Sequence, residues 1–206
     1  MTTIWGPLGW MTLHSMASIY ANEPTASEKQ LMTAWLDMFA GTITCSHCKE
    51  HFTDMLYVYR SKFPQMLSSR REFLLFTFRA HNAVNARLLK PVQHTVAECM
   101  ALLRNNMRTT PASTYRIAYL NHIRRYWRTL QDVSGMTALK KIVEMMKIET
   151  DYSTSRNNNF EEDIAEGMVV LPNTVLVKPG EEPPVQRPRP TGRGMVMTSG
   201  GLRFRR

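Results

Sequence analysis

Cys45-Ser46-His47-Cys48 opens the stretch CSHCKEHFTDMLYVY, residues 45–59, which is the most informative part of the sequence. We expect this stretch to form a helix with the two cysteines at its beginning. Backbone N–H groups and the helix dipole at that position favour a thiolate and lower the pKa of a cysteine. The spacing also lets both sulfurs lie on one turn and close a disulfide reversibly. The pair is therefore suited to two-electron exchange with another pair of thiols.

Two other interpretations of the cysteine pair stay open on spacing alone. Cys45, Cys48 and His51 could supply three ligands to a zinc ion, with His94 or Cys99 as the fourth. The cysteines could also be ordinary buried side chains. The spacing favours redox chemistry first, zinc second and simple burial third.

The chain up to about residue 105 has the pattern of successive helices joined by short connections, and no strand pattern competes with it. Pro7 suits the first turn of the first helix, and Thr25 or Ser27 suits the N-cap of the second. Pro91 ends the fourth helix. The expected helices cover residues 5–20, a stretch beginning near residue 27, and residues 45–59, 69–89 and 92–105.

The chain beyond residue 105 changes character twice. Residues 112–131 and 135–149 predict a helical hairpin, with Gly135 as the break between the two helices. Residues 168–177 contain two short apolar runs that indicate a small hairpin. From Pro179 onward, five prolines and five glycines predict an extended tail. We therefore divide the chain into residues 1–103, 104–150 and 151–206.

The composition excludes several classes of protein. The chain has 206 residues, of which 43% are apolar and 21% charged, so it can bury a core. Three cysteines are too few for a disulfide-dense secreted scaffold. No apolar run approaches the roughly 20 residues that span a bilayer, and no secretory signal is recognisable.

The net charge of +9 is distributed unevenly along the chain. Residues 1–103 carry +2 and residues 104–147 carry +7, whereas residues 148–182 carry −6 and residues 183–206 carry +6. Such blocks are typical of interaction segments, so we expect the second half of the chain to dock on another protein. Nucleic-acid binding is less favoured, because no aromatic-basic groove or known motif accompanies the charge.

Two further groups of residues lie on either side of the cysteine pair in the sequence. In the first group, Trp10 and His14 stand one helical turn apart. In the second, the stretch HNAVN at residues 81–85 places a ring, a methyl surface and an amide on one helix face. Arg87 and Lys90 follow it, and both suit contacts with phosphates. Each residue has an ordinary structural explanation when taken singly, but their joint occurrence in this order does not.

The order Trp-x-x-x-His, Cys-x-x-Cys, His-Asn-x-Val-Asn, Lys-Pro resembles the Erv/Alr family of flavin-linked sulfhydryl oxidases over about residues 5–103. The resemblance implies an all-α fold, a four-helix bundle with a short fifth helix that holds FAD at one end. It implies that Cys48 is the cysteine next to the flavin and that Cys45 accepts electrons from the substrate. The residues implied to contact the cofactor are Gly6, Trp10, His14, Tyr20, His81, Asn82, Val84, Asn85, Arg87 and Lys90.

The resemblance also implies an activity and partners. A substrate dithiol would reduce the Cys45–Cys48 disulfide, and the two electrons would pass through FAD to dioxygen to give hydrogen peroxide. The substrate would be a thiol-containing protein, for example a thioredoxin-like one, and the oxidase would form a homodimer through its first helices. The lack of a targeting segment and of extra shuttle cysteines fits the type found in large DNA viruses. Such a protein would work in the host cytoplasm or the virion, and its tail would dock on a virion component.

The sequence departs from the family pattern in several respects. Phe78 and Thr95 stand where a second cysteine pair often bridges the fourth and fifth helices. Cys99 has no obvious partner, so we expect a small buried side chain there. The alternative function is therefore a structural virion component, such as a minor capsid or scaffold protein built on the same bundle. Because every motif residue precedes position 104, we also expect removal of residues 104–206 to leave FAD binding intact.

Overall fold

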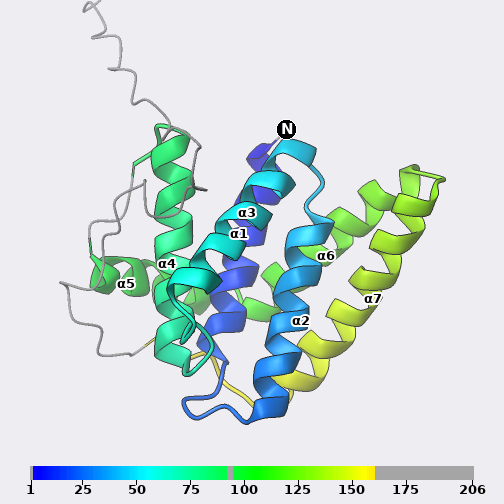
Figure 1. Ribbon diagram of the computed structural model, residues 1–206. Coiled ribbons are helices and arrows are strands. Elements are labelled where there is room, and N and C mark those ends of the chain that lie inside the picture. Colours follow the sequence, from blue (N-terminus) through cyan, green and yellow to red (C-terminus); the bar gives the residue numbers. More distant parts are fainter. Residues whose placement is uncertain (1, 92–94, 161–206) are drawn as a thin grey trace, which may run out of the picture.

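The computed structural model describes residues 2–91 and 95–160, and every regular element within these ranges is an α-helix (Figure 1). The all-α fold expected from the sequence is confirmed. The hairpin expected at residues 168–177 and the extended tail expected from Pro179 lie outside the described residues. The helices of the described part are α1 (Thr2–Ser18), α2 (Ala26–Thr42), α3 (Ser46–Lys62), α4 (Arg70–Arg87), α5 (Val96–Thr109), α6 (Ala112–Thr129) and α7 (Val133–Ser153).

Side-chain caps explain where most of these helices begin. Thr25 caps α2: its hydroxyl accepts a hydrogen bond from the N–H of Glu28 at 3.2 Å, and the Glu28 carboxylate accepts one from the N–H of Thr25 at 2.8 Å. Ser69, Thr95 and Asp132 accept from backbone N–H groups in the same way at the beginnings of α4, α5 and α7. These boundaries are therefore set by residues close by in the sequence.

Two helices differ in extent from what the sequence predicts. α1 begins at Thr2, so Pro7 lies inside the helix rather than in its first turn. The helix loses one backbone hydrogen bond there and continues. α5 runs on to Thr109, beyond the expected end at residue 105, because no helix-breaking residue comes before Pro111.

α1 lies between two other helices, with α4 on one side and α6 on the other, while α2 packs against α3 and α7 (Figure 1). Large side chains from all these helices meet in one hydrophobic core. The fully buried members of that core include Leu13, Trp35, Tyr59, Phe76, Tyr119 and Ile142.

α6 and α7 share this core and do not form one of their own. The Tyr119 ring of α6 stacks on Phe39 of α2, with centroids 5.2 Å apart, and the indole N–H of Trp127 donates to the Thr42 carbonyl at 2.8 Å. Gly9 of α1 allows the close approach of α6, because a Cβ atom at that position would lie 3.2 Å from the Tyr119 ring. The division expected after position 103 falls inside α5, and the hydrophobic core continues beyond it.

The turn between α6 and α7 depends on Gly135. This residue lies in the first turn of α7 rather than between the two helices, and its N–H donates to the Asp132 carboxylate at 2.7 Å. A Cβ atom at Gly135 would collide with the carbonyl oxygen of Leu130. A glycine is therefore needed for the two helices to turn back so tightly. None of the helices described is long and apolar enough to cross a membrane.

Candidate functional site

The two cysteines of the Cys-x-x-Cys pair are joined by a disulfide at the beginning of α3. Cys45 is the N-cap residue, and its sulfur accepts a hydrogen bond from the N–H of Cys48 at 3.3 Å. The two Cα atoms are 5.2 Å apart, and both residues are partly exposed. The pair therefore lies where the sequence predicts it, at a helix N-terminus that stabilises the thiolates formed on reduction.

Aromatic and imidazole rings from three helices gather near this disulfide. Trp10 of α1 stacks on His81 of α4, with ring centroids 4.2 Å apart and an angle of 11° between the planes. Trp10 also meets the edge of Phe52 with centroids 6.1 Å apart, and Phe52 lies one turn beyond Cys48 on α3. His14 adjoins the rings of Trp10 and His81, and its ring centroid lies 6.4 Å from that of Trp10. We call Trp10, His14, Phe52 and His81 the ring cluster.

A chain of hydrogen bonds orients the two histidines of the ring cluster. His14 Nε2 lies 3.2 Å from His81 Nδ1, and His14 Nδ1 lies 3.0 Å from the Thr77 hydroxyl oxygen. That hydroxyl donates to the Leu74 carbonyl at 2.8 Å, so it accepts from His14 Nδ1–H. His14 Nε2 then accepts from His81 Nδ1–H. This arrangement leaves His81 Nε2 as a hydrogen-bond acceptor for a ligand.

Both histidine rings are neutral at physiological pH. Burial lowers the pKa of His14 well below its usual value, and the neighbouring His81 lowers it further. Burial, with a smaller contribution from Lys90, lowers the pKa of His81 to about 4. The two rings therefore offer hydrogen bonds and flat surfaces without positive charge.

The C-terminal end of α4 brings cationic groups to the same region. Arg87 Nη2 donates to His47 Nε2 at 2.8 Å, which ties the end of α4 to the first turn of α3. After α4, Leu89 has a left-handed backbone with φ of 54°, and the N–H of Lys90 donates to the Asn85 carbonyl at 2.8 Å. The other expected contact residues on this helix are partly buried: Asn82, Val84 and Asn85.

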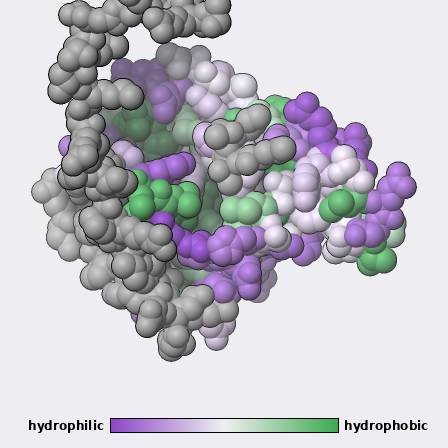
Figure 2. Space-filling view, turned by 90° about the horizontal axis from the view of Figure 1, so that it is seen from above, coloured by the Kyte–Doolittle hydropathy of each residue, from purple (hydrophilic) through white to green (hydrophobic). Residues whose placement is uncertain are grey.

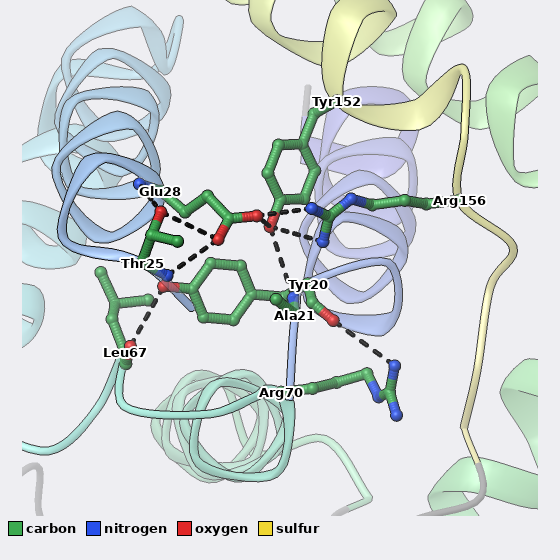
Figure 3. Close-up of polar contacts among 8 residues, drawn as sticks. All are labelled: Tyr20, Ala21, Thr25, Glu28, Leu67, Arg70, Tyr152 and Arg156. Carbon is green, nitrogen blue, oxygen red and sulfur yellow. Dashed lines mark hydrogen bonds and ion pairs between the residues drawn. The ribbon is translucent and has the colours of Figure 1, made fainter. Parts of the chain in front are cut away.

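Two expected cofactor residues do not contact the ring cluster. Gly6 lies one turn before Trp10, and a Cβ atom added there would have no other atom within 4 Å, so open space adjoins it. Tyr20 lies beyond the C-terminal end of α1, where its hydroxyl donates to the Leu67 carbonyl at 3.0 Å. Its ring stacks with that of Tyr152, with centroids 6.3 Å apart. Figure 3 shows Tyr20 in this separate network, which includes the ion pair between Arg156 and Glu28.

Sequence reasoning did not single out Phe52, Thr77 or His47, which contact this site. Phe52 follows Cys48 by four residues, and Thr77 precedes His81 by four residues. Residues four apart lie on the same face of a helix. Extending each motif by one helical turn would therefore have found both.

The described part of the structure provides no set of ligands for the zinc ion considered above. In the part of the chain that the structure describes, no group of three or more His, Cys, Asp or Glu side chains could hold a metal ion. The Cys45 and Cys48 sulfurs are bonded to each other, and His94 lies outside the described residues. Cys99 is a free, buried cysteine of α5, and burial raises the pKa of its thiol to about 12. The expectation of a small buried side chain at Cys99 is confirmed.

The site suits a planar aromatic ligand that carries phosphates. The ring cluster supplies flat apolar surfaces, and His81 Nε2 supplies an acceptor for a ring N–H. Arg87 and Lys90 supply cations at the end of α4, where phosphate oxygens would be neutralised. The residues present therefore fit the kind of cofactor that the sequence predicts.

Comparison with known proteins identifies the class to which the chain belongs. The model of the Erv1 / Alr family matches residues 8–110, which is half of the chain. This protein belongs to the Erv1/Alr family. The match ends just before α6, so α6 and α7 lie outside the region compared.

The relatives of this chain include proteins from viruses and from yeast. The chain is 39% identical over 88 residues to the putative FAD-linked sulfhydryl oxidase 096R of Invertebrate iridescent virus 3, a stretch that covers 43% of this chain and 58% of that protein. It is 34% identical over 88 residues to an FAD-linked sulfhydryl oxidase of African swine fever virus, covering 43% and 71%. It is 35% identical over 86 residues to the mitochondrial FAD-linked sulfhydryl oxidase ERV1 of Saccharomyces cerevisiae, covering 42% and 43%. No solved structure matches the chain.

Proposed function

We propose that this protein is an FAD-dependent sulfhydryl oxidase that forms disulfides in a partner protein and transfers the electrons to dioxygen. The observation that carries the proposal is the position of the Cys45–Cys48 disulfide, one helical turn from the ring cluster. Both cysteines are partly exposed, so a substrate thiol can reach them, whereas His14 is fully buried. Electrons accepted at the surface can therefore pass to a cofactor held on the inner side of the pair.

The exchange at the cysteines consists of two thiolate attacks. A substrate thiolate attacks the Cys45 sulfur, the Cys45–Cys48 bond breaks, and Cys48 leaves as a thiolate. The second substrate thiolate then attacks the substrate sulfur of the mixed disulfide, and Cys45 leaves as a thiolate. The substrate gains a disulfide and loses two electrons and two protons, and the cysteine pair gains the two electrons. The N-terminus of α3 stabilises the thiolates in both steps.

FAD, when bound, would supply the means to take two electrons from the reduced pair and deliver them to dioxygen, giving hydrogen peroxide. Trp10 and His81 would hold its ring system, since they provide flat surfaces in the ring cluster, which Phe52 links to the helix turn of Cys48. Arg87 and Lys90 would hold its phosphates. Thr77 would act through His14 by fixing the ring orientation, and the buried His14 would help to exclude water.

The substrate class follows from the chemistry, and the setting follows from the relatives. We propose a thiol-containing protein as substrate, and a viral protein that works in the host cytoplasm or the virion. The homodimer expected from the resemblance would form through the first helices. In this chain, α6 and α7 cover α1 and α2, so a second copy could reach that face only after displacing them. We therefore propose that this face is used within the chain.

The oxidase proposal is tested with two cysteine variants. Cys48→Ser is expected to abolish oxygen consumption with dithiothreitol, because the disulfide that accepts electrons can no longer form. Cys99→Ser, the matched control, is expected to retain most of the activity, because Cys99 is buried and free. FAD released from the purified wild-type protein is measured by absorbance after denaturation. Wild-type protein that neither contains nor takes up FAD, or equal loss of activity in both variants, contradicts the proposal.

A further inference from the structure

A surface hollow lies on the side of the cysteine pair that faces away from α4. It has a volume of about 430 Å³ and is formed by the end of α2, the first turn of α3, the end of α6 and the beginning of α7. It lies at the end of the molecule where α7 begins, which faces the viewer in Figure 2. Hydrophilic residues cover much of the surface around the α6–α7 turn in that view. The lining residues that matter are Gly41, Lys49, Trp127 and Lys141.

Two lysines give this hollow its positive charge. The Lys49 ammonium lies 5.6 Å from the centre of the Trp127 ring. The Lys141 ammonium lies over Gly41, at 3.2 Å from the position that a Cβ atom there would take. No acidic side chain lines the hollow, and neither lysine has an acidic partner among the residues described. The two charges are therefore available to an external anion.

The walls of the hollow are firmly held. Trp127 is buried, and its indole N–H donates to the Thr42 carbonyl at 2.8 Å. The Asp132 carboxylate nearby already accepts from the N–H of Gly135 and the hydroxyl of Ser134, both at 2.7 Å, as the cap of α7. A ligand would meet a preformed surface and would not have to order it.

The hollow adjoins the disulfide, because the first turn of α3 contributes to both. Lys49 directly follows Cys48 on the first turn of α3, and its side chain extends toward Trp127 of α6. On the other side of the same turn, His47 contacts Arg87 of α4. The disulfide thus lies between the site that suits the cofactor and the cationic hollow. A substrate that reaches Cys45 would pass directly beside the hollow.

We propose that this hollow binds acidic side chains that flank the reactive cysteines of the protein substrate. The inference rests on the proposed oxidase function and adds a docking site to it. Carboxylates placed between the two ammonium groups would be attracted by both, and attraction of this kind chiefly raises the rate of encounter. The attraction between solvent-exposed charges weakens as the salt concentration rises, because the Debye length is about 10 Å at 0.1 M.

The last described residues lie at the opposite end of the molecule from the hollow. The run EEDIAE begins directly after Phe160, and the N–H of Asn159 donates to the Ser18 carbonyl at the opposite end of the molecule. α7, with 21 residues, is about 31 Å long. The six residues of the run extend at most about 22 Å. We therefore commit to carboxylates of a partner protein as the occupant of the hollow.

The test uses two synthetic peptides that share one Cys-x-x-Cys dithiol, one followed by four glutamates and the other by four glutamines. Oxygen consumption gives kcat and KM for each peptide and for dithiothreitol. The wild type is expected to have the lower KM for the glutamate peptide. Lys141→Gln is expected to raise that KM about fivefold, leaving the glutamine peptide and dithiothreitol unaffected. Lys140→Gln is the matched control, because Lys140 is an exposed neighbour outside the hollow and the charge change is the same.

Several outcomes overturn the docking proposal. Equal KM values for the two peptides in the wild type exclude charge recognition. Equal effects of Lys140→Gln and Lys141→Gln show that overall charge acts, and not the hollow. Binding of a short uridine oligonucleotide that is tighter than that of the glutamate peptide, and is lost in Lys141→Gln, assigns the hollow to nucleic acid instead.

A measurement without turnover separates this proposal from the oxidase proposal. The glutamate peptide with both cysteines replaced by serine is titrated into the protein by calorimetry. Binding that is weakened by Lys141→Gln but not by Lys140→Gln supports the docking site even where dithiothreitol is not oxidised. The absence of such binding in a protein that oxidises dithiothreitol overturns the docking site and leaves the oxidase proposal intact.

Discussion

α1 contacts two different parts of the molecule through two of its faces. Trp10 and His14 lie on the face toward α3 and α4, where they meet His81. Gly9 and Ser15 lie on the face toward α6: Gly9 adjoins Tyr119, and Ser15 accepts a hydrogen bond from Arg116. The first face contains side chains suited to a cofactor, and the second contains side chains suited to close packing. α1 therefore contacts both the candidate site and the α6–α7 hairpin.

The two sides also differ in how they hold buried polar groups. On the α4 side, neutral histidines form a hydrogen-bonded chain that leaves one acceptor, His81 Nε2, for a ligand. On the α6–α7 side, the Trp35 indole donates to the buried Glu149 carboxyl at 3.1 Å. Arg116, which donates to Ser15, adds a positive charge that interacts with Glu149. The first arrangement is open to a ligand, whereas the second is closed within the protein. This contrast indicates that the buried polar groups of the α6–α7 side are satisfied within the core, whereas the α4 side offers a hydrogen-bond acceptor to a ligand.

The largest expected effect comes from removing the α6–α7 side altogether. A chain that ends after Thr110 would expose the faces of α1 and α2 that now contact Tyr119, Leu120 and Ile123. The position of the sequence motifs predicts that such a truncation keeps its FAD, but the packing leads us to the opposite expectation. The truncated chain should lose FAD and either aggregate or pair with itself through the exposed helices. Thermal unfolding, FAD content and light scattering measure these effects.

The full-length chain is the control for the truncation. Its mass by light scattering should be that of a single chain, because the same faces are already covered. A truncated chain that is monomeric, stable and loaded with FAD would show that the two sides are independent.

A smaller effect is expected from Glu149, within the α6–α7 side. Burial raises the pKa of Glu149 to about 7, although hydrogen bonding from Trp35 and the charge of Arg116 oppose the rise. The folded state therefore binds a proton more tightly than the unfolded state. Stability from this group is present below pH 4.5, the usual pKa of a glutamate side chain, and is lost as pH rises through about 7. The loss is up to about 3 kcal/mol.

Glu149→Gln isolates this contribution, because glutamine keeps the shape and cannot ionise. The free energy of unfolding is measured by urea titration between pH 4.5 and 8 for both proteins. The difference between variant and wild type should grow in favour of the variant as pH rises. His81 has a lowered pKa and changes stability in the opposite direction with pH, but it is common to both proteins and cancels in the difference. A difference independent of pH would show that folding does not raise the pKa of Glu149.

The smallest expected effect is on the α4 side, where Thr77 holds His14. Thr77→Val keeps the shape but removes the hydroxyl between His14 Nδ1 and the Leu74 carbonyl. We expect a loss of about 1 kcal/mol in stability and a several-fold weaker affinity for FAD, because His14 can then adopt either tautomer. Thr77→Ser, which retains the hydroxyl, should behave as the wild type. FAD affinity is measured by fluorescence quenching, and an unchanged affinity in Thr77→Val would show that the histidine chain does not act on the cofactor.

Much of the helical pattern was predictable because its signals are local. The cap at Thr25, the break before Pro91 and the cysteine pair at the start of a helix all depend on residues within one or two turns. The end of α5 was misplaced, because the chain contains no breaker where the motif region ends. Tyr20 was assigned to the cofactor by resemblance, whereas its contacts in the structure depend on Tyr152, which is distant in sequence.

Only the resemblance to the Erv/Alr family implied that Trp10, His14 and His81 belong to one site. The sequence by itself determined that the chain is helical and that Cys45 and Cys48 form a pair at a helix start. These conclusions need only the period of a helix and the spacing within short motifs. The tertiary structure alone decided that α6 and α7 cover α1 and α2, and that a cationic hollow lies beside the disulfide. Lys49 and Lys141 are separated by more than ninety residues. No local pattern indicates that two such residues meet, because their proximity follows only from how all the buried faces pack together.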